Sequence, residues 1–124
     1  MTARDFAAMT DQELAQEAAR LMGRAAVNAL LVEMYGKMGA EMEFCPTLLL
    51  GQAAAFGAAF LNRAHGLERW FELRVSVLRE SCHASMDSYD LPKEEHYTCD
   101  NASEARCRTE AVCAAWLALE GERG

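Results

Sequence analysis

The stretch from Pro46 to Asn62 contains no charged residue, and this constrains the fold more than any other feature of the sequence. Gln52 is its one strongly polar side chain before Asn62, and leucine, alanine, glycine and phenylalanine supply most of the rest. A helix that is apolar on every side is buried on every side in a globular protein. The stretch is too short to span a bilayer, which requires about 20 apolar residues. We therefore expect a central helix, from Cys45 to Gly66, that other helices surround.

A long helix is predicted ahead of this one, and a capping box marks its start. Thr10 and Glu13 stand three residues apart, so each side chain can bond the other residue's backbone amide. From there apolar positions recur at alternating spacings of four and three, which is the pattern of a coiled-coil seam. We expect the helix to run to Gly36 or Gly39, with Gly23 weakening its middle. The seam consists of Leu14, Ala18, Leu21, Ala25, Asn28, Val32 and Tyr35.

The segment from Leu67 to Met86 fits two patterns. Phe71, Leu73 and Val75 alternate with polar residues, as in a strand, but apolar residues also recur there at helical spacing. A strand needs partners to be stable, and no second strand is evident in the sequence. We therefore predict a helix, and a dimer that pairs two copies of this segment as strands is the alternative.

The remaining segments complete a prediction of an all-α fold. Residues 87–101 are rich in turn formers and read as a loop, and a last helix is expected to begin at Asn101 with Glu104 at its third position. Arg108 is then spaced for an ion pair with Glu104, and the tail from Gly121 is expected to fray. Apolar residues make up 52% of the chain, enough for a core. The prediction is a single domain over residues 1–124, a bundle of about four helices with a short helical turn at its N-terminus.

The charge and the cysteines restrict partners and compartment. The net charge is -7 and the pI about 4.9, so the surface repels phosphate groups. We therefore expect neither nucleic acid nor a membrane as a direct partner. Five cysteines are an odd number, and the first residues lack the basic and apolar regions of a secretory signal. Reduced thiols and a cytoplasmic location are expected.

Histidines and cysteines are the weak candidates for a metal site. A structural zinc site is usually built from two tight ligand pairs of the C-x-x-C kind, and the sequence has none. Unpaired cysteines are more often small buried apolar residues. We therefore predict no metal, although four residues are spaced to contribute ligands: Cys82, His83, His96 and Cys99.

No motif in the sequence predicts catalysis or a cofactor. Cys45 stands at the start of the predicted central helix, where the helix dipole favours a thiolate. A nucleophile also needs a base, and no histidine lies beside Cys45 in the sequence. We predict that the protein is not an enzyme and carries no cofactor.

The sequence favours a protein–protein interaction module, acting as an adaptor, an assembly factor or an inhibitor of another protein. Asn28, Val32 and Tyr35 continue the apolar seam of the first helix and are predicted to form an interface, with a homodimer or another protein as partner. The alternative for Asn28 is a position that faces solvent or bonds within the monomer. One version of the hypothesis is a small acidic inhibitor, encoded by a phage or mobile element, of a nucleic-acid-binding protein.

An acidic segment is the second predicted interaction region. Its carboxylates can steer the protein toward a basic partner surface, although charge runs are more often simply solvated. A metal- or ligand-binding bundle that uses the cysteines and histidines is the alternative function. The acidic residues singled out are Asp87, Asp90, Glu94 and Glu95.

Overall fold

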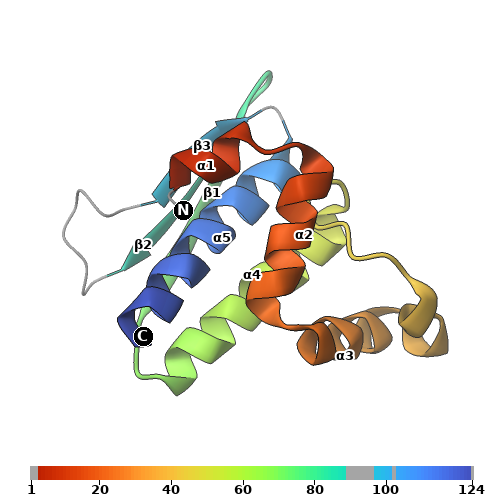
Figure 1. Cartoon of the computed structure of the whole chain (residues 1–124). Helices are drawn as coiled ribbons and strands as arrows, with labels where there is room; N and C mark the ends of the chain where they lie inside the picture. Colours follow the sequence, from red (N-terminus) through yellow and green to blue (C-terminus); the bar gives the residue numbers. More distant parts are fainter. Residues whose placement is uncertain (1–2, 89–96, 102, 124) are drawn as a thin grey trace.

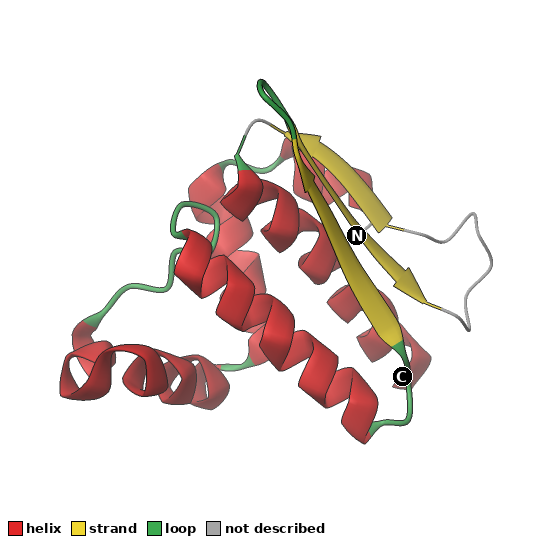
Figure 2. Cartoon of the chain, turned by 180° about the vertical axis from the view of Figure 1, so that it is seen from behind, coloured by secondary structure: helices red, strands yellow, loops and turns green. Residues whose placement is uncertain are grey.

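Helices and a sheet form two layers in this protein (Figure 1, Figure 2). The computed structural model describes residues 3–88, 97–101 and 103–123. In that part of the chain, α-helices and one 3₁₀ helix accompany a three-stranded antiparallel sheet. The elements in chain order are α1 (Ala3–Ala8), α2 (Asp11–Met22), α3 (Arg24–Tyr35), the 3₁₀ helix η1 (Gly36–Glu41), α4 (Leu50–Gly66), β1 (Phe71–Val77), β2 (Cys82–Ser88), β3 (Tyr97–Asn101) and α5 (Glu104–Arg123).

The predicted all-α bundle of about four helices is wrong, because the segment predicted as the third helix is a β-hairpin. Its second half, β2, supplies the partner that the strand pattern of β1 needed, with Phe71 opposite Ser88 and Val77 opposite Cys82. The supposed loop after it contains β3, which pairs with β2 on its other side. The protein is therefore a mixed α/β fold whose sheet packs against α5.

The capping box at the start of α2 is confirmed. The Thr10 hydroxyl accepts a hydrogen bond from the Glu13 amide at 3.1 Å, and the Glu13 carboxylate accepts one from the Thr10 amide at 3.1 Å. The prediction of a single long helix from this point is wrong, because the helix is interrupted at Gly23. That residue has φ of +94°, a conformation that glycine adopts without a steric penalty, so α2 ends there and α3 begins.

The helix α4 begins later than the sequence predicts. Pro46 lies ahead of it in a turn, in which the amides of Leu48 and Leu49 donate to the Cys45 carbonyl at 3.2 and 3.0 Å. The Pro46 carbonyl accepts a hydrogen bond from the Thr109 hydroxyl at 2.9 Å. This turn is thereby tied to α5, and the regular helix starts at Leu50.

The core lies between the sheet, α4 and α5. One face of the sheet contributes apolar side chains, among them the buried Ala84 and Met86 of β2. The Trp116 ring of α5 stacks on Phe56 at a centroid distance of 5.4 Å and lies 5.6 Å from Phe60. These three aromatic rings join α4 to α5 beneath β1.

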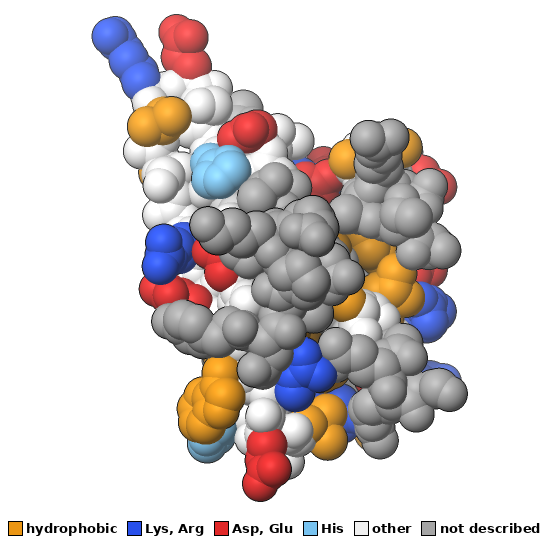
Figure 3. All heavy atoms as spheres, turned by 90° about the vertical axis from the view of Figure 1, so that its left-hand side faces the viewer, with side chains coloured by type: hydrophobic (Ala, Val, Ile, Leu, Met, Phe, Trp, Pro, Cys, Tyr) orange, Lys and Arg blue, Asp and Glu red, His pale blue; other side chains and the backbone are white. Residues whose placement is uncertain are grey.

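The opposite face of the sheet is polar. His83 and Asp100 are cross-strand neighbours there, with 2.8 Å between Nδ1 and the carboxylate. Arg74 lies 3.2 Å from Glu72 and 3.9 Å from Asp87. Acidic and basic side chains are interspersed on the side of the molecule that Figure 3 shows. Apolar and polar residues alternate along the strands because only one face meets the helices.

The cap of α5 is displaced by two residues from the prediction. Ser103, not Asn101, accepts the capping hydrogen bond, from the Arg106 amide at 3.2 Å. Asn101 instead accepts a bond from the Ser103 amide at 2.9 Å. The predicted ion pair of Glu104 with Arg108 is confirmed at 3.0 Å. The helix continues to Arg123, past the point where the sequence predicts fraying.

Arg106 joins the N-terminal segment to α5. Its guanidinium is buried and donates to the Met9 carbonyl at 2.6 Å, the Phe6 carbonyl at 3.1 Å and the Asp11 carboxylate at 2.8 Å. The carboxylate of Glu110, one turn along α5, lies 3.3 Å away. The arginine thus satisfies the last carbonyls of α1 and pairs with the first turn of α2.

Candidate functional site

The helix α3 lies apart from the main body, at the end of the molecule away from the sheet (Figure 1, Figure 2). Its principal contacts are with η1, and it contacts α2 less extensively. Glycines in the left-handed half of backbone space bound it, with φ of +94° at Gly23 and +70° at Gly36. The helix and η1 therefore form an arm on the side of the domain, which Val27 and Leu31 join to the core.

Most of α3 is exposed although its sequence is almost entirely apolar. Only Val27 and Leu31 are buried among its residues. The three residues predicted to form an interface, Asn28, Val32 and Tyr35, are exposed on one side of the helix, and Val32 retains 43% of its surface. The structure brings the three together, with Asn28 in solvent.

An apolar groove of about 540 Å³ lies between α3 and α4. Alanines from both helices line much of it, together with Met22 and Met34. A Cβ atom built on Gly51 would lie 3.7 Å from the Met34 methyl group, so the Met34 side chain reaches close to α4 at that point. The lining residues are Met22, Ala26, Ala29, Leu30, Glu33, Met34, Ala55, Ala58, Ala59 and Asn62.

Exposed leucines continue this surface at the start of α4. Leu49 and Leu50 are exposed, and Ala54 and Ala58 follow Leu50 at intervals of four on the same exposed side. We call the exposed apolar surface of α3 and α4, with the groove between them, the α3–α4 face. The sequence predicted that other helices would surround α4; instead its outer side is uncovered in the described part of the chain. The core covers only the side that carries Phe56 and its neighbours.

Gln52 explains why one polar residue interrupts the uncharged stretch. Its side chain is buried, and its oxygen accepts a hydrogen bond from the Cys45 amide at 2.6 Å. Its nitrogen donates to the Tyr35 hydroxyl at 3.2 Å and the Glu43 carbonyl at 3.4 Å. Gln52 therefore holds the end of α3 and the chain that follows η1 against α4.

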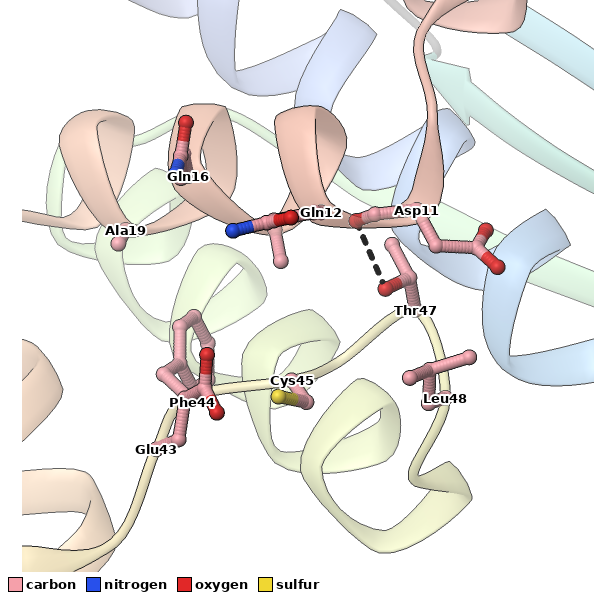
Figure 4. Close-up of a pocket in the computed structure, with 10 residues that line it drawn as sticks. Asp11, Gln12, Gln16, Ala19, Glu43, Phe44, Cys45, Thr47 and Leu48 are labelled. Carbon is pink, nitrogen blue, oxygen red and sulfur yellow. Dashed lines mark hydrogen bonds between the residues drawn. The ribbon is translucent and has the colours of Figure 1, made fainter.

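A second opening, of about 500 Å³, lies between α2 and residues 43–48 (Figure 4). Gln12 of α2 lies across it from Phe44 and Cys45 (Figure 4). Thr47 closes one end by donating to the Asp11 carbonyl at 3.0 Å. Most of the residues that line the opening have amide or apolar side chains.

The expectation of a thiolate at Cys45 is not supported. Burial, and next the nearby Glu43, raise the pKa of the Cys45 thiol above its ordinary value. The residue precedes the first turn of α4 by several residues, so the helix dipole does not act on it as predicted. The thiol is therefore protonated at neutral pH and a poor nucleophile.

The described residues among those predicted as weak candidates for metal ligands lie on opposite faces of the sheet. Cys82 and Cys99 belong to the face that meets α5, whereas His83 lies on the opposite face beside Asp100. His96 falls outside the described residues. Within the described ranges, no group of three or more histidines, cysteines and carboxylates is placed to hold a metal ion.

The acidic segment is described only in part. Asp87 lies on the polar face of β2, 3.9 Å from Arg74. The other three acids singled out, Asp90, Glu94 and Glu95, lie outside the described residues. The interaction predicted for this segment therefore stays a prediction.

Sequence patterns did not reveal two features of the structure. The burial of Arg106 depends on Asp11 and on carbonyls near residue 9, which are distant in the sequence. The groove between α3 and α4 depends on the break at Gly23, which turns α3 away from the line of α2. The positive-φ glycine was visible in the sequence as a weak point, but the direction of the turn was not.

No family model, curated protein or solved structure matches this chain. None of the helices in the described part is both long and apolar enough to cross a membrane.

Proposed function

We propose that this protein is a non-catalytic interaction module that self-associates through the α3–α4 face. One observation carries the proposal: α3 is apolar along most of its length, yet only Val27 and Leu31 are buried. Removal of apolar surface from water stabilises an association by roughly 25 cal/mol per Å² before the costs of binding. On soluble proteins, a continuous exposed apolar surface indicates an interaction site more often than single exposed apolar residues do.

The charge distribution favours a second copy as the partner. The chain carries a net charge of -7, so two copies repel each other over most approaches. The α3–α4 face is the exception, because residues 46–62 carry no charge and α3 carries only Arg24 and Glu33. Two like-charged copies meet with the least repulsion at a surface that carries few charges.

The shape of the face also suits a symmetric dimer. A twofold interface uses the same patch on both subunits, so the patch must contain both projections and recesses. Leu49 and Leu50 project at the start of α4, and the groove lined by Ala55 and Ala59 is recessed. The flexible methionines that line the groove can adapt to inserted side chains.

The test is the oligomeric state of the untagged chain, measured by sedimentation equilibrium over a range of concentrations. We expect a dimer at micromolar concentrations. Ala29→Glu and Ala58→Glu each place a charge in the groove at an exposed helical position, and should weaken the dimer at least about tenfold. Gln16→Glu adds the same charge on α2, outside the face, and serves as the matched control.

Three outcomes would count against the proposal. A wild-type chain that remains monomeric up to several hundred micromolar would overturn it. Equal weakening of the dimer by Gln16→Glu would show that the groove variants act through net charge alone. A dimer that is as stable with both groove variants as with the wild type would show that the interface lies elsewhere. Circular dichroism of the variants checks that each monomer keeps its fold.

A further inference from the structure

Three of the five cysteines lie together between the sheet and α5. The Cys107 thiol, on α5, donates to the Cys82 carbonyl of β2 at 2.9 Å and is 3.5 Å from the Cys99 carbonyl of β3. The Sγ atoms of Cys99 and Cys107 lie 3.0 Å apart. Two sulfur atoms at this separation need only a small movement to reach the covalent S–S distance of about 2 Å.

We propose that Cys99 and Cys107 form a redox-active dithiol, which a hydroperoxide converts into a disulfide that joins β3 to α5. This site is independent of the proposed self-association, since it lies on the sheet side of α5 rather than on the α3–α4 face. The disulfide would make the attachment of β3 to α5 depend on the redox state, and β3 is an edge strand of the sheet.

The difference in burial assigns the two roles. Cys99 is only partly buried, whereas Cys107 is fully buried, so Cys99 is the more accessible of the two to a small peroxide. Cys99 therefore reacts first, and its sulfur takes one oxygen from the hydroperoxide to give a sulfenic acid and water or an alcohol. The Cys107 sulfur then attacks the Cys99 sulfur, the S–O bond breaks, and the leaving hydroxide takes the Cys107 proton to form water.

The surroundings of the pair make this reaction slow at neutral pH. Burial, and next a hydrogen bond with the Glu110 carboxyl and contact with Cys107, raise the pKa of Cys99. Burial also raises the pKa of Cys82 to about 11, with Cys107 adding to the effect. Because the thiolate is the reactive form, the dithiol resists brief exposure and responds to sustained peroxide. Proximity to Cys107, rather than an acidic thiol, is what selects Cys99.

The test is the intact mass of the folded chain after incubation with excess hydrogen peroxide. We expect a loss of about 2 Da that dithiothreitol reverses, since disulfide formation removes two hydrogens. Proteolytic mapping under non-reducing conditions should show Cys99 linked to Cys107. The oxidised chain should also unfold at a temperature higher by on the order of 5 to 10 °C, because the bridge restricts the unfolded state.

Matched cysteine variants separate this pair from the other thiols. Cys99→Ser and Cys107→Ser should each abolish the loss of mass, whereas Cys45→Ser and Cys113→Ser should leave it unchanged. Circular dichroism checks that Cys107→Ser is folded. If Cys107→Ser does not fold, Cys99→Ser, at the more exposed position, tests the same disulfide. Peroxide treatment in concentrated guanidinium should yield mixed linkages, which shows that the native fold selects the pair.

Two results would overturn the proposal. One is a native chain that gains oxygen atoms at its cysteines without losing about 2 Da. The other is a bridge that maps to Cys82 and Cys107, or to two different chains, instead of Cys99 and Cys107.

Discussion

The helices α3 and α5 bury their side chains in opposite ways. In α5, the charged residues Arg106 and Glu110 are buried together with Thr109, which has no exposed surface. In α3, apolar residues such as Val32 remain exposed, and Val27 and Leu31 alone are buried. The more polar of the two helices is therefore the more deeply buried.

Position in the fold accounts for this inversion. The helix α5 contacts α1, α2, α4 and the strands of the sheet, so nearly every side of it meets another element. The buried side chains of Arg106, Thr109 and Glu110 are tolerated there because each bonds to another group, as Thr109 does to the Pro46 carbonyl. The helix α3 principally meets η1 and α2, which leaves its other sides uncovered within the described chain. Burial is thus decided by neighbours rather than by the composition of a helix.

Removal of the Arg106 side chain should give the largest effect. Arg106→Ala removes the guanidinium from the buried Glu110 carboxylate and from the carbonyls of Phe6 and Met9. We expect the free energy of unfolding to fall by about 3–5 kcal/mol in urea titrations. Arg108→Ala is the control on the same helix, because its partly exposed pair with Glu104 should contribute less than about 1 kcal/mol. Equal losses in the two variants would show that the buried network is not what holds the N-terminus to α5.

The second prediction compares two equally buried leucines. Leu31 on α3 and Leu119 on α5 each expose 2% of their surface. Leu119→Ala should lower the global free energy of unfolding by about 2–5 kcal/mol, because it opens a cavity in the main core. Leu31→Ala should lower it by only about 2 kcal/mol and also accelerate amide hydrogen exchange in α3, because Leu31 belongs to the same core cluster but α3 has fewer neighbours than α5.

The outcome of this comparison tests whether the arm is separable. Similar global losses in the two leucine variants, with no local change in exchange, would mean that α3 and η1 unfold only with the whole domain.

A smaller effect is expected at the capping box of α2. Thr10→Ala removes the acceptor of the Glu13 amide and should lower the free energy of unfolding by about 1 kcal/mol. Gln12→Ala, an exposed substitution in the same first turn, is the control and should change stability little. Because α2 contacts α5, we expect the loss to appear in global unfolding rather than in local fraying.

The smallest predicted effect is a dependence on pH at Glu13. Its hydrogen bonds with the Thr10 amide and then the Thr10 side chain hold the pKa of Glu13 below its ordinary value of 4.5. A lowered pKa in the folded state means that the ionised carboxylate stabilises the fold above pH 4.5. This contribution is lost as the pH falls through the lower, folded-state pKa. The Tm of the wild type should exceed that of Glu13→Gln at neutral pH, and the difference should disappear on acidification. A difference that persists in acid would assign it to something other than the charge.

Several features of the fold were predicted from short stretches of sequence. The capping box at Thr10, the weakness at Gly23 and the ion pair of Glu104 with Arg108 all depend on residues at most four apart. The strand pattern of residues 71–77 was also present, although the helical interpretation was preferred. That choice was wrong because β2 carries only a weak pattern of its own and becomes a partner through the hairpin.

The candidate site was predictable in part for the same reason. Asn28, Val32 and Tyr35 were found because helical spacing places them on one side of a helix wherever that helix lies. Whether that side faces a neighbour or solvent depends on the turn at Gly23, and the groove depends on how α4 is placed beside it. The proximity of Cys99 and Cys107 likewise required β3 to pair with β2 and to face α5.

Helix caps, breaks at glycine and the periodicity of each segment follow from the amino-acid sequence alone. Those features depend on hydrogen bonds and steric limits among neighbouring residues, so they are present before the chain folds. Tertiary structure alone decided that Arg106 is buried, that α3 is exposed and that residues 71–77 are a strand. Each of these depends on a partner distant along the chain, and packing provides that partner only when the elements assemble.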